Sequence, residues 1–169
     1  MADDADPPLL FLDVDGPVLP FGADVTDVTV DDLWDDVMES QLARLDHALG
    51  LRLLALPCRL VWATAWEDGA NAEIAPRIGL GELPVVIWPA PSDDRAREDA
   101  WSGLHWKTRT LVDWAAGRDF AWVDDEITEA DREWVAEHHT GRALLHRVDP
   151  SRGLTDDDFA ALDEWLKAH

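Results

Sequence analysis

The sequence predicts an α/β protein with a doubly wound, three-layer parallel sheet of the Rossmann-like kind. Short apolar runs alternate with helical segments along the chain, which is typical of parallel strands whose connecting helices cover both faces of a sheet. Carboxylates or a hydroxyl directly follow several of these runs, and such sheets bind ligands at the carboxyl ends of their strands. The length of 169 residues favours one domain. We therefore expect a disordered acidic leader over residues 1–8 and a single domain over residues 9–169.

The predicted strands are short apolar runs bounded by polar residues, glycine or proline. They comprise Leu9–Val14, Leu60–Ala63, Val85–Trp88, Phe120–Val123 and Ala143–Val148. Residues 17–31 are expected to form a small flap or hairpin after the first strand. Residues 89–104 are polar and are expected to form a loop.

Helices are expected where apolar residues recur at helical spacing between the strands. The predicted helices cover residues 32–49, 67–78, 106–116, 128–139 and a last segment that begins at Thr155. Gly50 is placed to end the first of these helices. Thr128 and Asp131 have the spacing of a capping box, with Asp in place of the usual Glu or Gln.

Charge and cysteine content narrow the classes of function. The net charge is -22 at pH 7, so non-specific binding to nucleic acid or to an anionic membrane is not expected. Cys58 is the single cysteine, which excludes an intrachain disulfide and a cysteine-rich zinc site. The acidic N-terminus does not resemble a signal peptide, and no stretch has the roughly 18 apolar residues of a membrane span. We therefore expect a cytoplasmic protein, with its oligomeric state left open.

The most informative segment is the apolar run Leu9–Leu12 and the Asp13, Val14, Asp15 and Gly16 that follow it. In an extended chain, residues i and i+2 point to the same side, so both carboxylates face one pocket. The glycine lets the backbone turn sharply away. This strand with its D-x-D-G motif resembles the first motif of the haloacid dehalogenase (HAD) superfamily of phosphohydrolases.

Residues at the other predicted strand ends match the remaining HAD motifs in their usual order. Thr64 follows the second strand, Lys107 begins a helix, and Asp124 and Asp125 follow the run Phe120–Val123. The resemblance covers about residues 9–130. Together with the segment that starts RVDPSRGLTDDD, these motifs are also similar to the HAD domains of multidomain RNA-repair proteins. The resemblance implies a HAD-like Rossmannoid fold.

The resemblance also implies a phosphatase that works through an aspartyl-phosphate intermediate. Asp13 resembles the nucleophile. Asp15 resembles the general acid that protonates the leaving oxygen and then acts as base on the hydrolytic water. Thr64 and Lys107 complete the expected catalytic set. The expected substrate-binding residues are Thr64, Trp66, Asn71 and Lys107.

Several carboxylates in one pocket require a cation. Two unit charges about 4 Å apart repel by roughly 4 kcal/mol at an effective dielectric constant of 20, and a phosphate dianion adds to this repulsion. Oxygen ligands beside a phosphate favour Mg²⁺. The resemblance implies that Asp13, the main-chain carbonyl of Asp15 and Asp124 bind the metal. Asp125 is expected to be a further ligand or a neighbour of the ligands.

HAD enzymes usually have a cap inserted after the first motif or after the third strand, and residues 17–31 and 89–104 are too few for a folded cap domain. We therefore expect a capless protein with an open site. Its substrate would be a phosphorylated small molecule or a macromolecular phosphate end. Two alternatives are a HAD-like protein that binds without catalysis and a receiver-like phospho-acceptor module. Receivers place the acceptor Asp at the third strand, which fits this order of motifs poorly.

Overall fold

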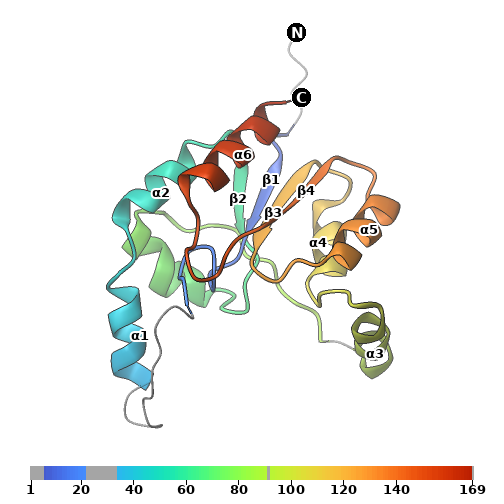
Figure 1. Ribbon diagram of the computed structural model, residues 1–169, viewed down its shortest axis with the longest axis horizontal. Coiled ribbons are helices and arrows are strands. Elements are labelled where there is room, and N and C mark those ends of the chain that lie inside the picture. Colours follow the sequence, from blue (N-terminus) through green and yellow to red (C-terminus); the bar gives the residue numbers. More distant parts are fainter. Residues whose placement is uncertain (1–5, 22–33, 91, 169) are drawn as a thin grey trace.

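A four-stranded parallel sheet lies at the centre of the computed structural model, which describes residues 6–21, 34–90 and 92–168 (Figure 1). The strand order is β2-β1-β3-β4, and every neighbouring pair is parallel. The strands are β1 (Leu9–Leu12), β2 (Arg59–Trp62), β3 (Phe120–Asp124) and β4 (Ala143–Arg147). This arrangement confirms the predicted α/β fold class.

Helices cover both faces of the sheet, which gives the three predicted layers (Figure 1). On one face lie η1 (Ala70–Ile74), η2 (Ala75–Ile78), α2 (His47–Leu54) and α6 (Asp156–Lys167), and on the other α4 (Thr108–Ala115) and α5 (Glu129–His138). Side chains of β1 alternate between the two cores: Leu10 and Leu12 pack on the first face, and Leu9 and Phe11 on the second. Both cores therefore hold β1 rigidly, with its end at the centre of the sheet.

The helix predicted over residues 32–49 is two helices in the described part of the chain. Helix α1 (Trp34–Leu42) ends well before α2, which starts after Asp46. The carboxylate of Asp46 accepts a hydrogen bond from the Ala48 amide at 2.9 Å and so caps α2. Gly50 lies inside α2, so its predicted role as a helix end was wrong. An added Cβ there would lie 2.0 Å from the Ile78 carbonyl oxygen, and the glycine therefore allows close packing of η2 on α2.

Two further predictions, both between β2 and β3, were wrong. Val85–Trp88 is not a strand of the sheet; Val85 forms only an isolated bridge with Trp62. Residues 89–104 contain helix α3 (Asp93–Ser102), capped by Ser92 and ended by Gly103 in the left-handed region. No side chain of α3 is buried, so its sequence lacks the apolar periodicity that indicates a helix.

Other local predictions are confirmed. Thr128 and Asp131 form the capping box at the start of α5, and Thr155 opens α6 in the same way with Asp158. Among the described residues there is no folded cap over the sheet (Figure 1); residues 22–31 of the predicted flap lie outside them. No helix in the described ranges has the length and apolarity needed to cross a bilayer.

Candidate active site

The topology brings the acidic and polar strand ends together. Because β2, β1 and β3 are neighbours in the sheet and run parallel, the residues that follow them meet at one edge. Thr64 follows β2, Asp13 follows β1, and Asp124 is the last residue of β3. All three are buried. This edge therefore holds a preformed polar site on a rigid scaffold.

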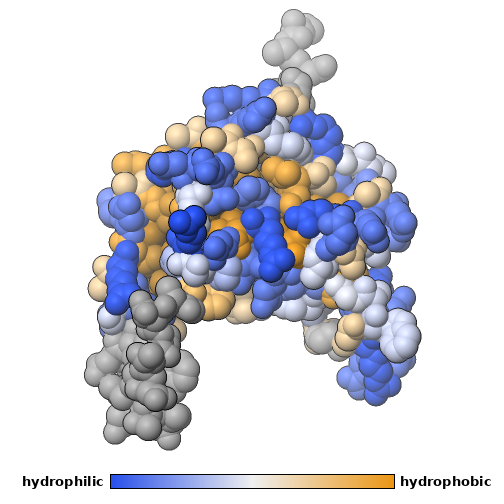
Figure 2. Space-filling model, in the orientation of Figure 1, coloured by the Kyte–Doolittle hydropathy of each residue, from blue (hydrophilic) through white to orange (hydrophobic). Residues whose placement is uncertain are grey.

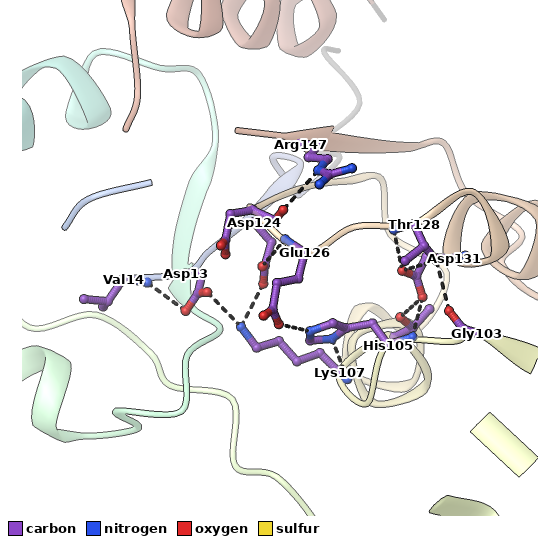
Figure 3. A network of polar contacts seen from close by, with 12 residues as sticks. Asp13, Val14, Gly103, His105, Lys107, Asp124, Glu126, Thr128, Asp131 and Arg147 are labelled. Carbon is purple, nitrogen blue, oxygen red and sulfur yellow. Dashed lines mark hydrogen bonds and ion pairs between the residues drawn. The ribbon is translucent and has the colours of Figure 1, made fainter. Parts of the chain in front are cut away.

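Lys107 lies between two carboxylates from different strands (Figure 3). Its Nζ is 3.2 Å from Asp13 Oδ2 and 2.8 Å from Asp124 Oδ2. The second oxygen of Asp13 accepts a hydrogen bond from the Val14 amide at 2.8 Å, and that of Asp124 accepts one from the Glu126 amide at 3.1 Å. The lysine and both carboxylates are thus fixed in place before any ligand arrives.

Asp125 completes a cluster of three carboxylates at the end of β1 and β3. Oxygens of Asp13, Asp124 and Asp125 all lie within 4.8 Å of one another. Gly16 makes room for this cluster: it has φ of 100°, and a Cβ at this position would be 2.9 Å from Cβ of Asp125. The glycine of the D-x-D-G motif is therefore needed for the turn and for the close approach.

The three carboxylates differ in proton affinity because their surroundings differ. Burial raises the pKa of Asp13 to about 7; Lys107 opposes this shift and the Asp124 charge adds to it, and burial is the largest of these effects. Burial and the neighbouring Asp124 charge also raise the pKa of Asp125 to about 6. Burial also tends to raise the pKa of Asp124. The ion pair and hydrogen bond with Lys107 outweigh this effect and hold the pKa of Asp124 below its usual range. One lysine therefore leaves the cluster with uncompensated negative charge at neutral pH.

Asp15 is exposed and is not one of the three carboxylates of this cluster. Its Oδ2 accepts a hydrogen bond from the indole nitrogen of Trp66 at 3.0 Å. The main-chain amide of Trp66 donates to Thr64 Oγ1 at 3.2 Å, so one tryptophan connects the two polar residues. The carboxylate of Asp15 is therefore more solvated than that of the buried Asp13.

Asn71, predicted to bind substrate, is engaged within the protein. Its amide oxygen accepts hydrogen bonds from the Trp62 indole and from the Leu83 amide, and its amide nitrogen donates to the Leu83 carbonyl. These contacts fasten the segment after η2 to β2. A substrate-binding role for Asn71 stays a prediction.

A network behind Lys107 was not predicted. His105 has only 7% of its side chain exposed; its Nδ1 faces the Lys107 amide at 3.2 Å and its Nε2 lies 3.0 Å from Glu126 Oε2 (Figure 3). The fully buried Asp131 accepts hydrogen bonds from the His105 amide at 2.8 Å and from Thr108 Oγ1 at 2.7 Å. Asp131 therefore caps α5 and also holds the loop that presents Lys107. Only the capping role has a signal in the sequence.

The fold and the site together define a HAD-like Rossmannoid protein. Acidic residues lie at the ends of β1 and β3, a threonine follows β2, and a lysine lies between the Asp13 and Asp124 carboxylates. The model of one family, the HAD domain in Swiss Army Knife RNA repair proteins, matches residues 9–159. The chain therefore belongs to this family. Comparisons with curated proteins and with solved structures give no match.

The donor set fits a hard divalent cation. Three carboxylates converge within 4.8 Å, all their donor atoms are oxygen, and a single lysine faces them. Carboxylate oxygens are the ligands that Mg²⁺ prefers. This cluster could therefore hold one metal ion.

Proposed function

We propose that the protein is a Mg²⁺-dependent phosphomonoesterase that works through an aspartyl-phosphate on Asp13. The observation that supports this most strongly is the buried Asp13 carboxylate, held by Lys107 within a cluster of three carboxylates at the carboxyl edge of the sheet. A nucleophile in this position is fixed by its contacts and is not freely solvated.

Each residue of the site has a role in this reaction. Asp13 attacks phosphorus in line with the leaving oxygen. Asp15, which is exposed and two residues further along the chain, donates a proton to that oxygen and later removes one from the attacking water. Thr64 and Lys107 bind phosphoryl oxygens, with Lys107 opposing the charge that accumulates as the bond forms.

The metal would be bound by Asp13, Asp124, Asp125 and the main-chain carbonyl of Asp15. Bound there, Mg²⁺ would neutralise charge on the phosphoryl group and orient it. The fixed contacts of Asp124 with Lys107 and the Glu126 amide keep its carboxylate ionised for this role.

The substrate we propose is a phosphorylated small molecule or a macromolecular phosphate end. The family description names RNA repair proteins, which favours nucleic-acid ends among the macromolecular candidates. The net charge of -22 disfavours binding along a nucleic-acid backbone, which favours contact with an end over contact with a long stretch. Membership of a HAD family leaves the receiver-like alternative without support.

Phosphate release from a generic phosphate ester tests this proposal. We expect turnover with Mg²⁺ and none after chelation. A folded protein that releases no phosphate from any ester tried, with or without divalent metal, would instead be the non-catalytic binding protein named as an alternative.

Asp15→Asn should distinguish esters by their leaving groups. A nitrophenolate leaves with little protonation, whereas an alkyl alcohol needs a proton, and general acid catalysis contributes about 100- to 10,000-fold. We therefore expect the rate with an alkyl phosphate to fall by about a hundredfold or more, and that with nitrophenyl phosphate by much less. Steady-state kinetics on both esters measure this difference. Equal losses, where leaving-group departure limits the rate, would contradict the acid role.

A further inference from the structure

A cavity of about 660 Å³ lies between α3 and α4, lined in part by His105 and Trp106, which precede Lys107 in the chain. Its volume is within the range of small-molecule sites. Helix α3, which forms one wall, projects from the body of the protein at the lower right of Figures 1 and 2. The residues lining the cavity include Trp88, Ala96, Ala100, Leu104, Trp106 and Arg109.

Aromatic side chains form the wall of this cavity nearest the site. We call Trp88, His105 and Trp106 the aromatic wall. The Trp88 and Trp106 rings pack edge to face with centroids 4.9 Å apart, and His105 stacks on Trp106 with centroids 5.6 Å apart. Trp106 nevertheless keeps 50% of its surface exposed. A large apolar ring is thus held in a fixed orientation with part of its surface open to a ligand.

The aromatic wall is continuous with the phosphoryl-binding residues. The indole nitrogen of Trp88 donates to the Thr64 carbonyl at 2.9 Å. The Nζ of Lys107 lies 5.4 Å from the centroid of the Trp106 ring. A phosphoryl group bound by Thr64 and Lys107 would therefore have the aromatic wall directly beside it.

We propose that this cavity binds a flat aromatic ring carried by the leaving group of the phosphate ester, stacked on Trp106. The proposal rests on the proposed phosphatase function and names its substrate class. The ring could belong to a nucleobase or to an isolated aryl group, because both present a π-face to an indole.

Charges around the cavity disfavour a second phosphate as its ligand. The Arg109 guanidinium is already paired with Asp99 at 2.8 Å and lies over the Trp134 ring. Arg95 is a second cation of the lining, whereas Asp113 and Glu126 join Asp99 as carboxylates, so the lining has three carboxylates and two cations. An uncharged ring is therefore better suited to this cavity than an anion. A cationic ammonium group is the competing ligand, since aromatic and acidic side chains also bind such groups.

Four phosphate esters test whether the cavity prefers an aromatic ring or a cationic group. All four have an alkyl leaving oxygen, so the chemistry of the leaving group stays the same. Glycerol phosphate has no ring, benzyl phosphate has an isolated ring, adenosine 5′-monophosphate has a nucleobase, and phosphocholine has a cation. We expect wild-type kcat/KM to be higher for the two ring esters than for glycerol phosphate. Whichever of benzyl phosphate and adenosine 5′-monophosphate has the higher kcat/KM shows whether the ring is an isolated aryl group or a nucleobase.

Trp106→Ala should lower the ratio of ring-ester to glycerol-phosphate kcat/KM by about tenfold or more. Trp106→Phe should restore most of that ratio because it keeps an aromatic face. Trp101→Ala is the matched control, since Trp101 is 95% exposed on α3 and does not line the cavity. It should leave the ratio as in the wild type.

Three outcomes would overturn the inference while the phosphatase proposal stands. They are equal losses on all esters in Trp106→Ala, a wild type without preference for ring esters, and a preference for phosphocholine. If no ester is hydrolysed, the proposed function fails, and calorimetric binding to Asp13→Asn decides the cavity separately. Adenosine 5′-monophosphate should then bind more tightly than glycerol phosphate, and adding Trp106→Ala should remove that difference; equal binding would overturn the inference.

Discussion

Asp13→Asn is expected to lower phosphate ester turnover by at least about a thousandfold, because it removes the nucleophilic charge with almost no change in side-chain shape. The amide oxygen can still accept the hydrogen bond that Val14 donates to Asp13. The fold should therefore survive, as circular dichroism would show. Full turnover by a folded Asp13→Asn protein would refute the covalent mechanism.

The same substitution should stabilise the metal-free protein at neutral and alkaline pH. The pKa of Asp13 is raised to about 7 in the folded state, so its contribution to stability is fully present below its unfolded pKa near 4. That contribution is lost as pH rises through about 7, when the buried carboxylate must ionise. Asn does not ionise, and the gain at pH 8 is on the order of a few kcal/mol.

Thermal melts in chelator at several pH values measure this gain. The melting temperature of Asp13→Asn should exceed that of the wild type at pH 8, and the difference should shrink steadily between pH 7 and pH 4. A wild type that is the more stable of the two at pH 8 would show that the Lys107 ion pair outweighs the cost of burying Asp13.

The parts of the fold that were predictable are those with a local signal and a buried partner. The strand β1 is apolar on both faces because both helix layers cover it. Its uninterrupted run of four apolar residues is enough to predict a strand buried on both faces. Helix α3 buries no side chain, so no periodicity marks it. Gly50 resembles a helix stop locally, and only the approach of Ile78 from a distant segment explains its place inside a helix.

The same distinction applies to the candidate site. Asp13, Thr64 and Asp124 could be predicted because each follows an apolar run, and parallel strand ends must converge. Lys107 comes from a loop, and its position depends on His105 and on Asp131, which lies on another helix. Contacts between distant segments produce no residue pattern that can be recognised in the sequence. The spacing of Thr128 and Asp131 indicates only the capping role of Asp131 and not its contact with His105.

The metal assignment predicts a second large effect: millimolar Mg²⁺ should raise the melting temperature of the wild type. A ligand that binds only the folded state stabilises it by about 2.7 kcal/mol at one hundred times its dissociation constant. For a domain of this size each kcal/mol shifts the melting temperature by about 2–4 °C. Because Asp13 and Asp125 have raised pKa values near 7 and 6, protons compete with the metal, and the shift should be larger at pH 8 than at pH 5.5.

Asp124→Asn should reduce the Mg²⁺ shift most clearly, because it removes a charge from the centre of the cluster. Glu137→Gln is the matched control: it also removes one negative charge, but from an exposed position on α5. At equal ionic strength the control should respond to Mg²⁺ as the wild type does, which separates site binding from general screening of the -22 charge. If Asp124→Asn and Glu137→Gln show the same Mg²⁺ shift, the cation acts on the overall charge, and the carboxylate cluster is not its site.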